Sequence, residues 1–124
     1  AVNFQLHDIL DSESLPEPEL RQKSEIIVSN PPYICNSERK DMSHNVLDYE
    51  PETALFVPDD DPLRFYRAIG RYARQALKPG GRLYFEVNSL YADDVAEMLR
   101  GLSFSKTEIR KDDFGKNRFV LADF

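Results

Sequence analysis

The residues most suited to chemistry form one short segment, Asn30-Pro31-Pro32-Tyr33, which closely follows the apolar run Ile26-Ile27-Val28. Proline has no backbone N–H and a φ angle fixed at about −65°, so two prolines make a stiff turn that offers carbonyl acceptors without competing donors. The Asn30 carboxamide oxygen and the Pro31 carbonyl can accept both hydrogens of a planar –NH2 group, and the Tyr33 ring can pack on its face. The segment therefore predicts a binding site for an amide or aromatic amine.

An amine of this kind is a poor nucleophile because its lone pair is delocalised. Holding both N–H bonds orients the nitrogen and favours electron density on it as a new bond forms. This is catalysis by positioning and electrostatics, without a general base, and it requires a strong electrophile. On these residues alone, the simpler interpretation that the prolines only end a strand stays open.

The other reactive side chains have structural explanations. Cys35 is the sole cysteine, which excludes a disulfide within the chain, and without a visible activating His it is expected to pack and not to act as a nucleophile. His7 and His44 stand apart, without metal-ligand spacing. The acidic run at residues 59–61 precedes Pro62 and is explained by helix initiation. No metal site is predicted.

The elements before and after the segment must position it. Residues 2–6 alternate apolar and polar, as in a half-buried strand, and residues 25–29 are expected to form a strand buried on both faces of a parallel sheet. A helix should begin at Pro62, with Asp61 as its cap, and end near Lys78, where Pro-Gly-Gly follows. Its core face comprises Tyr66, Ile69, Ala73, Ala76 and Leu77, and a separate basic stripe comprises Arg64, Arg67, Arg71, Arg74 and Lys78.

The second half of the chain continues the alternation. Residues 82–87 should form a strand, and a helix should run from about 91 to 100, capped by Ser89 or Asn88 and closed at Gly101. Residues 104–110 and 118–124 should pair as an antiparallel hairpin. The pattern predicts an α/β fold with a mostly parallel sheet and one reversed strand.

Three polar residues fall at the expected carboxyl ends of strands, namely Asp8, Asn30 and Glu86. Ligands of open α/β sheets bind in the crevice beyond those ends. The three side chains are therefore candidates for one site.

Composition narrows the class of protein. The chain has 124 residues, 41% hydrophobic and 31% charged, which describes one ordinary globular domain. A net charge of −6 argues against a large nonspecific nucleic-acid surface on this chain. No apolar run approaches the roughly 20 residues of a membrane span and no signal-peptide pattern opens the chain, so no membrane partner and a cytoplasmic location are expected.

Several segments of the sequence resemble those of a known protein family. The stretch Ile-Ile-Val-Ser-Asn-Pro-Pro-Tyr-Ile at residues 26–34 resembles the amine motif of class I (Rossmann-like) S-adenosylmethionine-dependent methyltransferases that act on exocyclic or amide nitrogens. Together with Val-Leu-Asp-Tyr-Glu-Pro-Glu-Thr-Ala-Leu at 46–55, Leu-Lys-Pro-Gly-Gly at 77–81 and Lys-Asp-Asp-Phe-Gly-Lys-Asn-Arg at 111–118, it is similar to the HemK (PrmC) family. That family methylates the side-chain amide of a glutamine in peptide-chain release factors.

The resemblance implies roles for individual residues. Asn30, Pro31, Pro32 and Tyr33 would bind the glutamine amide, and Asn30 would also lie near the methyl donor, S-adenosyl-L-methionine. Asp8 and Ile9 would lie by the adenine of that cofactor, although Ile9 replaces an aromatic residue that is frequent there. Glu86 matches a family glutamate, whereas Asn88 and Tyr91 replace a Gly and a Gln.

The family's Gly-rich cofactor loop has no counterpart in this sequence, and the chain begins at Ala1 without a Met. Residues 1–124 are therefore expected to be the C-terminal part of the catalytic domain, without the cofactor-loop half and the N-terminal helical domain. In the family's strand order, 3-2-1-4-5-7-6, residues 2–6 would be strand 3 and residues 25–29 strand 4. Because strands 1 and 2 are missing, strand 4 should present an unpaired apolar edge that can pair with another copy, and residues 2–6 should be displaced or paired with a copy.

The resulting expectation is an enzyme, a protein-(glutamine-N(5)) methyltransferase whose protein partner is a release factor. One alternative is methylation of an exocyclic amine of adenine or guanine in nucleic acid, which would require extrusion of a paired base. Another is that these 124 residues alone are an inactive fragment or an interaction module. The basic stripe on the first helix is expected to be a solvated helix face and not a partner surface.

Overall fold

The computed structural model describes residues 2–11, 15–32, 34–35, 56–57 and 60–124. Four strands form one sheet in the order β1-β4-β6-β5: β1 (Ser24–Ser29), β4 (Leu77–Glu86), β6 (Asn117–Asp123) and β5 (Lys106–Lys111). A short parallel pair, β2 (Ile34–Cys35) and β3 (Phe56–Val57), follows β1 in the chain. Tyr33, Asp59 and most of the connection between residues 34 and 58 lie outside the described residues.

The sheet is mixed, as predicted. β1 runs parallel to β4, whereas β6 pairs antiparallel with both β4 and β5. The predicted α/β fold with one reversed strand and a C-terminal antiparallel hairpin is confirmed. The order also matches the expected succession of strands 4, 5, 7 and 6, which makes the chain compatible with part of a methyltransferase fold.

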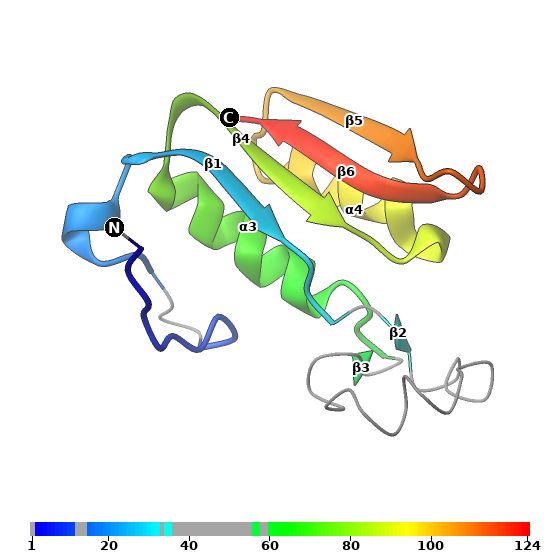
Figure 1. Ribbon diagram of the computed structural model, residues 1–124, viewed down its shortest axis with the longest axis horizontal. Helices are drawn as coiled ribbons and strands as arrows, with labels where there is room; N and C mark the ends of the chain where they lie inside the picture. Colours follow the sequence, from blue (N-terminus) through cyan, green and yellow to red (C-terminus); the bar gives the residue numbers. More distant parts are fainter. Residues whose placement is uncertain (1, 12–14, 33, 36–55, 58–59) are drawn as a thin grey trace.

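Both long helices, α3 (Arg64–Ala76) and α4 (Ala92–Gly101), cover the same face of the sheet (Figure 1). Two single-turn 3-10 helices, η1 (Pro18–Leu20) and η3 (Ser89–Tyr91), complete the described elements. The core lies between the two helices and the inward side chains of β4 and β6, and the fully or nearly fully buried residues are Tyr66, Ile69, Ala73, Leu77, Leu83, Phe85, Val87, Ala92, Val95, Ala96, Leu99, Phe104, Val120 and Ala122. No helix in the described ranges combines the length and apolar character needed to cross a membrane.

The core face predicted for α3 is confirmed, but the predicted helix start is wrong. The helix begins two residues later than Pro62, with Leu63 at the N-cap and no side-chain cap. Asp61 does not cap the helix because its carboxylate pairs with Arg67, at 3.2 Å between Oδ2 and Nη1, while its carbonyl accepts from the Arg64 N–H. The chain thus makes a turn before the helix starts.

The helix ends at Ala76 and the next residue, Leu77, already belongs to β4. β4 is therefore longer than the predicted strand at residues 82–87, and it includes the Pro-Gly-Gly sequence that was expected to stop the helix. Gly80 adopts a φ of 84°, which favours glycine, and its N–H donates to the carbonyl of Phe124. The glycines therefore shape the start of a strand.

The remaining predicted elements are present, but the predicted cap of the second helix is wrong, because α4 begins after Tyr91 and has no side-chain cap. Asn88 caps η3 by accepting a hydrogen bond from the Leu90 N–H at 3.0 Å, and α4 follows directly. Val95 and Leu99 are buried, and α4 ends at Gly101. The hairpin of β5 and β6 forms in the predicted place.

Two predictions near the N-terminus are wrong. Residues 2–6 form no strand, and Val2, Phe4 and Leu6 are exposed, because the alternating segment lies against no described strand that could hydrogen-bond to it. β1 is not buried on both faces, since Ile26 is 60% exposed and Val28 is 75% exposed. A continuous apolar run does not reveal whether helices cover one face of its sheet or both.

Candidate active site at the carboxyl end of β1

The structure places Asn30 directly after β1, at the end of the sheet. Ser29, the last residue of β1, is in register with Phe85 of β4, so Asn30 and Glu86 follow paired residues at the same edge of two parallel strands. Asn30 is exposed, Pro31 is buried and Pro32 is half-buried. An accessible carboxamide is thus attached to an anchored proline, which is an arrangement that can present a fixed acceptor to a ligand.

The neighbouring end of β4 is held by a side chain from the first turn of α3. Tyr66 is completely buried, its ring packs edge-on against Phe85 with centroids 5.1 Å apart, and its hydroxyl oxygen accepts a hydrogen bond from the Asn88 N–H at 3.2 Å. Sequence reasoning assigned Tyr66 to the core but missed this hydrogen bond. The residue type could have indicated this hydrogen bond, because a buried tyrosine needs a partner for its hydroxyl.

The turn between β5 and β6 supports the same end of the sheet. Arg118 donates through Nη1 to the Val87 carbonyl at 3.4 Å and forms an ion pair through Nε with Asp112 at 3.3 Å. The Asp112 carboxylate also accepts from the N–H groups of Phe114 and Lys116. These hydrogen bonds, that from Lys116 first, lower the pKa of Asp112, and its charge keeps the turn closed. The sequence motif at 111–118 therefore has a structural explanation.

Asp8 and Ile9 do not lie at a strand end in this structure. Asp8 accepts from the Leu10 N–H at 2.9 Å in a local turn, and Ile9 packs against the core. The preceding His7 contacts Tyr72 of α3, with ring centroids 5.4 Å apart. Of the three predicted strand-end residues, the structure thus brings Asn30 and Glu86 to one edge and places the neighbourhood of Asp8 along α3.

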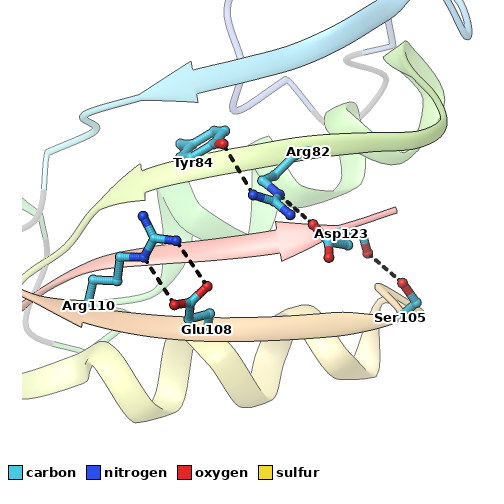
Figure 2. A network of polar contacts seen from close by, with 6 residues as sticks. All are labelled: Arg82, Tyr84, Ser105, Glu108, Arg110 and Asp123. Carbon is cyan, nitrogen blue, oxygen red and sulfur yellow. Dashed lines mark hydrogen bonds and ion pairs between the residues drawn. The ribbon is translucent and has the colours of Figure 1, made fainter.

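Four charged side chains on the uncovered face of the sheet form two ion pairs (Figure 2). Arg82 pairs with Asp123 and also donates to the Tyr84 hydroxyl, and both contacts raise the pKa of Arg82. Glu108 pairs with Arg110, whose hydrogen bond lowers the pKa of Glu108. Because these charges already pair with one another, the end of β1 is the better candidate for a ligand site. Within the described part of the chain, no group of three or more His, Cys, Asp and Glu residues is placed to hold a metal ion.

A strand followed directly by Asn-Pro-Pro, in a mixed sheet of this order, is compatible with part of a methyltransferase fold, and similar proteins make the assignment more specific. The chain is 44% identical over 122 residues to a release factor glutamine methyltransferase of Bacteroides thetaiotaomicron, covering 98% of this chain and 42% of that protein. It is 42% identical over 115 residues to a release factor glutamine methyltransferase of Flavobacterium psychrophilum, covering 93% of this chain and 40% of that protein. A bifunctional methyltransferase of Rickettsia typhi is 36% identical over 100 residues, which is 81% of this chain and 19% of that protein.

These similarities confirm the resemblance that the motifs indicate: the chain is similar, over nearly all its length, to part of the release factor glutamine methyltransferases. The chain spans about two fifths of the length of the first two relatives. No protein-family profile matches the chain.

Proposed function

We propose that this chain is the C-terminal part of the catalytic domain of a cytoplasmic, class I S-adenosylmethionine-dependent methyltransferase. Its reaction transfers a methyl group to the side-chain amide nitrogen of a glutamine in a peptide-chain release factor. The observation that carries the proposal is the exposed Asn30 at the carboxyl end of β1, followed by the buried Pro31. The names of the similar proteins supply the substrate class.

Asn30 and Pro31 receive the amide in this proposal. The carboxamide oxygen of Asn30 and the carbonyl oxygen of Pro31 each accept one amide hydrogen, and Tyr33 packs on the plane of the amide. The two acceptors orient the nitrogen lone pair toward the methyl donor and stabilise positive charge that develops on the nitrogen. Burial of Pro31 fixes the direction of this turn, so little reorganisation is needed when substrate binds.

The cofactor implied by this chemistry is S-adenosyl-L-methionine, which supplies an electrophilic methyl group on a sulfonium. Asn30 fits one part of the site for this cofactor, because its side chain is accessible at the carboxyl end of β1. Asp8 and Ile9 are the proposed residues on the adenine side, where Asp8 is exposed and Ile9 is partly buried against the core. When bound, this cofactor would supply the methyl group and keep the bonding electron pair as a thioether, while Asn30 and Pro31 would hold the amide nitrogen that accepts the methyl group and then loses a proton to solvent.

Substitution of Asn30 by Ala tests the role of its carboxamide. In the complete enzyme with its release factor, mass spectrometry should show one methyl group gained on the glutamine, and Asn30→Ala should lower turnover at least about 100-fold, the loss typical of removing one transition-state hydrogen-bonding group. Asn3→Ala is the matched control, because Asn3 is an exposed asparagine in the segment before the core.

Unchanged turnover in Asn30→Ala would contradict the proposed role of Asn30. Methylation of an adenine or guanine amine in place of the glutamine would contradict the proposed substrate. The net charge of −6 gives that alternative no support.

A further inference from the structure

We propose that Arg118 is a positioning residue for the methyl transfer: it fixes the backbone just beyond β4 and, through that backbone, the direction of Asn30. This role rests on the proposed function, in which Asn30 receives the amide. It uses contacts that join β6, the β5–β6 turn and the end of β4, and it does not depend on which surfaces of the chain are exposed.

Arg118 contacts both backbone polar groups of Val87, the first residue after β4. The Val87 N–H donates to the Arg118 carbonyl at 2.8 Å, and Arg118 Nη1 donates to the Val87 carbonyl at 3.4 Å. The last printed pair of the β4–β6 ladder is Glu86 with Phe119, so Val87 lies one residue beyond it. The guanidinium therefore holds the backbone at the point where strand pairing ends.

The guanidinium is itself held by Asp112, at the start of the β5–β6 turn. Arg118 Nε lies 3.3 Å from Asp112 Oδ2, and the two side chains are 24% and 19% exposed, against 54% and 78% for the Arg100–Glu97 pair of α4. Solvent weakens a partly shielded ion pair less than an exposed one. Asp112 also accepts from two N–H groups of the turn, which lies at the end of the sheet where β4 finishes (Figure 1). The donor to Val87 is thus fixed in place.

The backbone that Arg118 holds is next to the strand end that precedes Asn30. Ser29 and Phe85 are in register in the parallel pair of β1 and β4, so Asn30 follows β1 beside the residue that ends β4. A shift of the end of β4 would therefore move the acceptor proposed at Asn30. A displacement of about 1 Å at a reacting group can cost about 100-fold in rate. Arg118 can thus affect the reaction through β4.

Tyr66 holds the next residue along the chain, because its hydroxyl accepts from the Asn88 N–H at 3.2 Å. Two consecutive residues beyond β4 are therefore held by side chains from two elements, α3 and β6. Tyr66 is completely buried, so its substitution also disturbs the core. Arg118 is not part of the buried core, and its substitution can test positioning separately.

Arg118→Leu in the complete enzyme tests this role, because leucine keeps an apolar stem and removes the donors to Val87 and Asp112. The kcat on the release factor should fall about tenfold while KM for the release factor changes less than about threefold, since a misplaced acceptor acts mainly in the transition state. Arg100→Leu is the matched control, because it removes an arginine ion pair, with Glu97, that lies on α4. Its kcat should stay within about twofold of the unsubstituted value, as for most surface substitutions.

A double-mutant cycle with Asn30→Ala separates positioning from general damage. Once Asn30 is alanine, Arg118→Leu should lower turnover by less than about a further threefold, because the acceptor that it positions is already absent. Equal losses in the two backgrounds, or unchanged kcat in Arg118→Leu, would overturn the proposal.

Hydrogen exchange on the same variants is a readout that does not depend on activity. The amides of Val87 and Asn88 should exchange about tenfold faster in Arg118→Leu, because local opening becomes easier, and should be unchanged in Arg100→Leu. Asp112→Asn is a second variant, which keeps an oxygen for the turn and removes the charge beside Arg118, and it should raise the same exchange by a smaller factor. It takes the place of Arg118→Leu in each comparison if circular dichroism shows that Arg118→Leu does not fold.

Unchanged exchange in both variants would overturn the positioning role whatever reaction the enzyme catalyses. If the unsubstituted enzyme places no methyl group on the glutamine, the proposed function fails, and a role of Arg118 in that reaction fails with it. In an enzyme that does methylate the glutamine, unchanged exchange or equal losses in the cycle would overturn the role of Arg118 alone.

Discussion

Tyr66 joins three parts of the molecule through one side chain. Its position on α3 buries the ring, the ring edge contacts Phe85 of β4, and the hydroxyl receives the N–H of Asn88 just beyond β4. Because Phe85 is in register with Ser29, the same contact helps to fix the strand end that precedes Asn30. A packing residue thereby becomes a positioning residue for the candidate site.

Replacing Tyr66 by Phe should destabilise the chain by about 1–3 kcal/mol, because the Asn88 N–H would lose an acceptor at a buried position. Denaturant unfolding at a concentration where the chain is monomeric measures this change. Tyr72→Phe is the control on the same helix, where the ring is only partly buried, and it should cost less than about 0.5 kcal/mol. Equal effects of the two substitutions would show that the Tyr66 hydroxyl contributes nothing specific.

At the scale of elements, Gly81 lies where the backbone of β4 passes close to that of β1. A Cβ atom on residue 81 would lie 2.9 Å from the carbonyl oxygen of Lys78 and 3.1 Å from that of Glu25. Backbone atoms cannot rotate away as a flexible side chain can. Glycine is therefore required here by space, whereas at Gly80 it is favoured by the φ of 84°.

Gly81→Ala should accordingly destabilise the chain by about 1–3 kcal/mol, as overpacking against fixed atoms does. Gly101→Ala is the matched control, since a Cβ atom there meets nothing within 4 Å. The control should be neutral or stabilising by about 0.4–1 kcal/mol, because alanine restricts the unfolded chain. Thermal or urea unfolding of both variants gives the comparison, and a stabilising Gly81→Ala would contradict the steric argument.

The elements that sequence predicted best are those with a strong local signal. α4 has an apolar face and a terminal glycine, and the β5–β6 hairpin has a turn rich in Asp, Gly and Asn. The failures depend on distant partners. Residues 2–6 have the alternation of a strand, but no described strand pairs with them. The apolar run in β1 does not indicate how many faces of that strand are covered. The start of α3 shifted because Asp61 pairs with Arg67 instead of capping.

For the candidate site, local sequence was sufficient to place Asn30 at the end of a strand. Its neighbour Glu86 also falls at the predicted strand end. The contact between Tyr66 and Asn88 could not be predicted, because it depends on how α3 lies across the sheet. The roles of Asn30, Pro31, Pro32 and Tyr33 in binding an amide stay predictions.

At the scale of the whole molecule, the chain contains a sheet with helices on one face and an accessible Asn30 at one end. The amine-binding segment is present, but the sequence contains no Gly-rich loop of the kind that the resemblance places around the methionine part of the cofactor. The sequence thus contains the amine-binding part of the expected site, but not the loop expected around the methionine part of the cofactor.

Titration calorimetry of these 124 residues with S-adenosyl-L-methionine should therefore show no binding tighter than about 1 mM, an affinity of about −4 kcal/mol. The same titration on a complete methyltransferase checks the ligand. Micromolar binding by this chain would mean that Asn30 and its surroundings suffice to bind the cofactor. The expectation that the chain lacks part of the cofactor site would then be wrong.

The connectivity of β1 has a consequence for the order in which the molecule assembles. Tyr66 and Asn88 are 22 residues apart and the Ser105–Asp123 contact in the hairpin spans 18, whereas the Lys78–Glu25 contact between β1 and β4 spans 53. The entropy lost on closing a loop grows with its length, so among these contacts the entropic cost is greatest for docking β1. The strand that precedes Asn30 is accordingly attached to the rest of the sheet by the least local of these contacts.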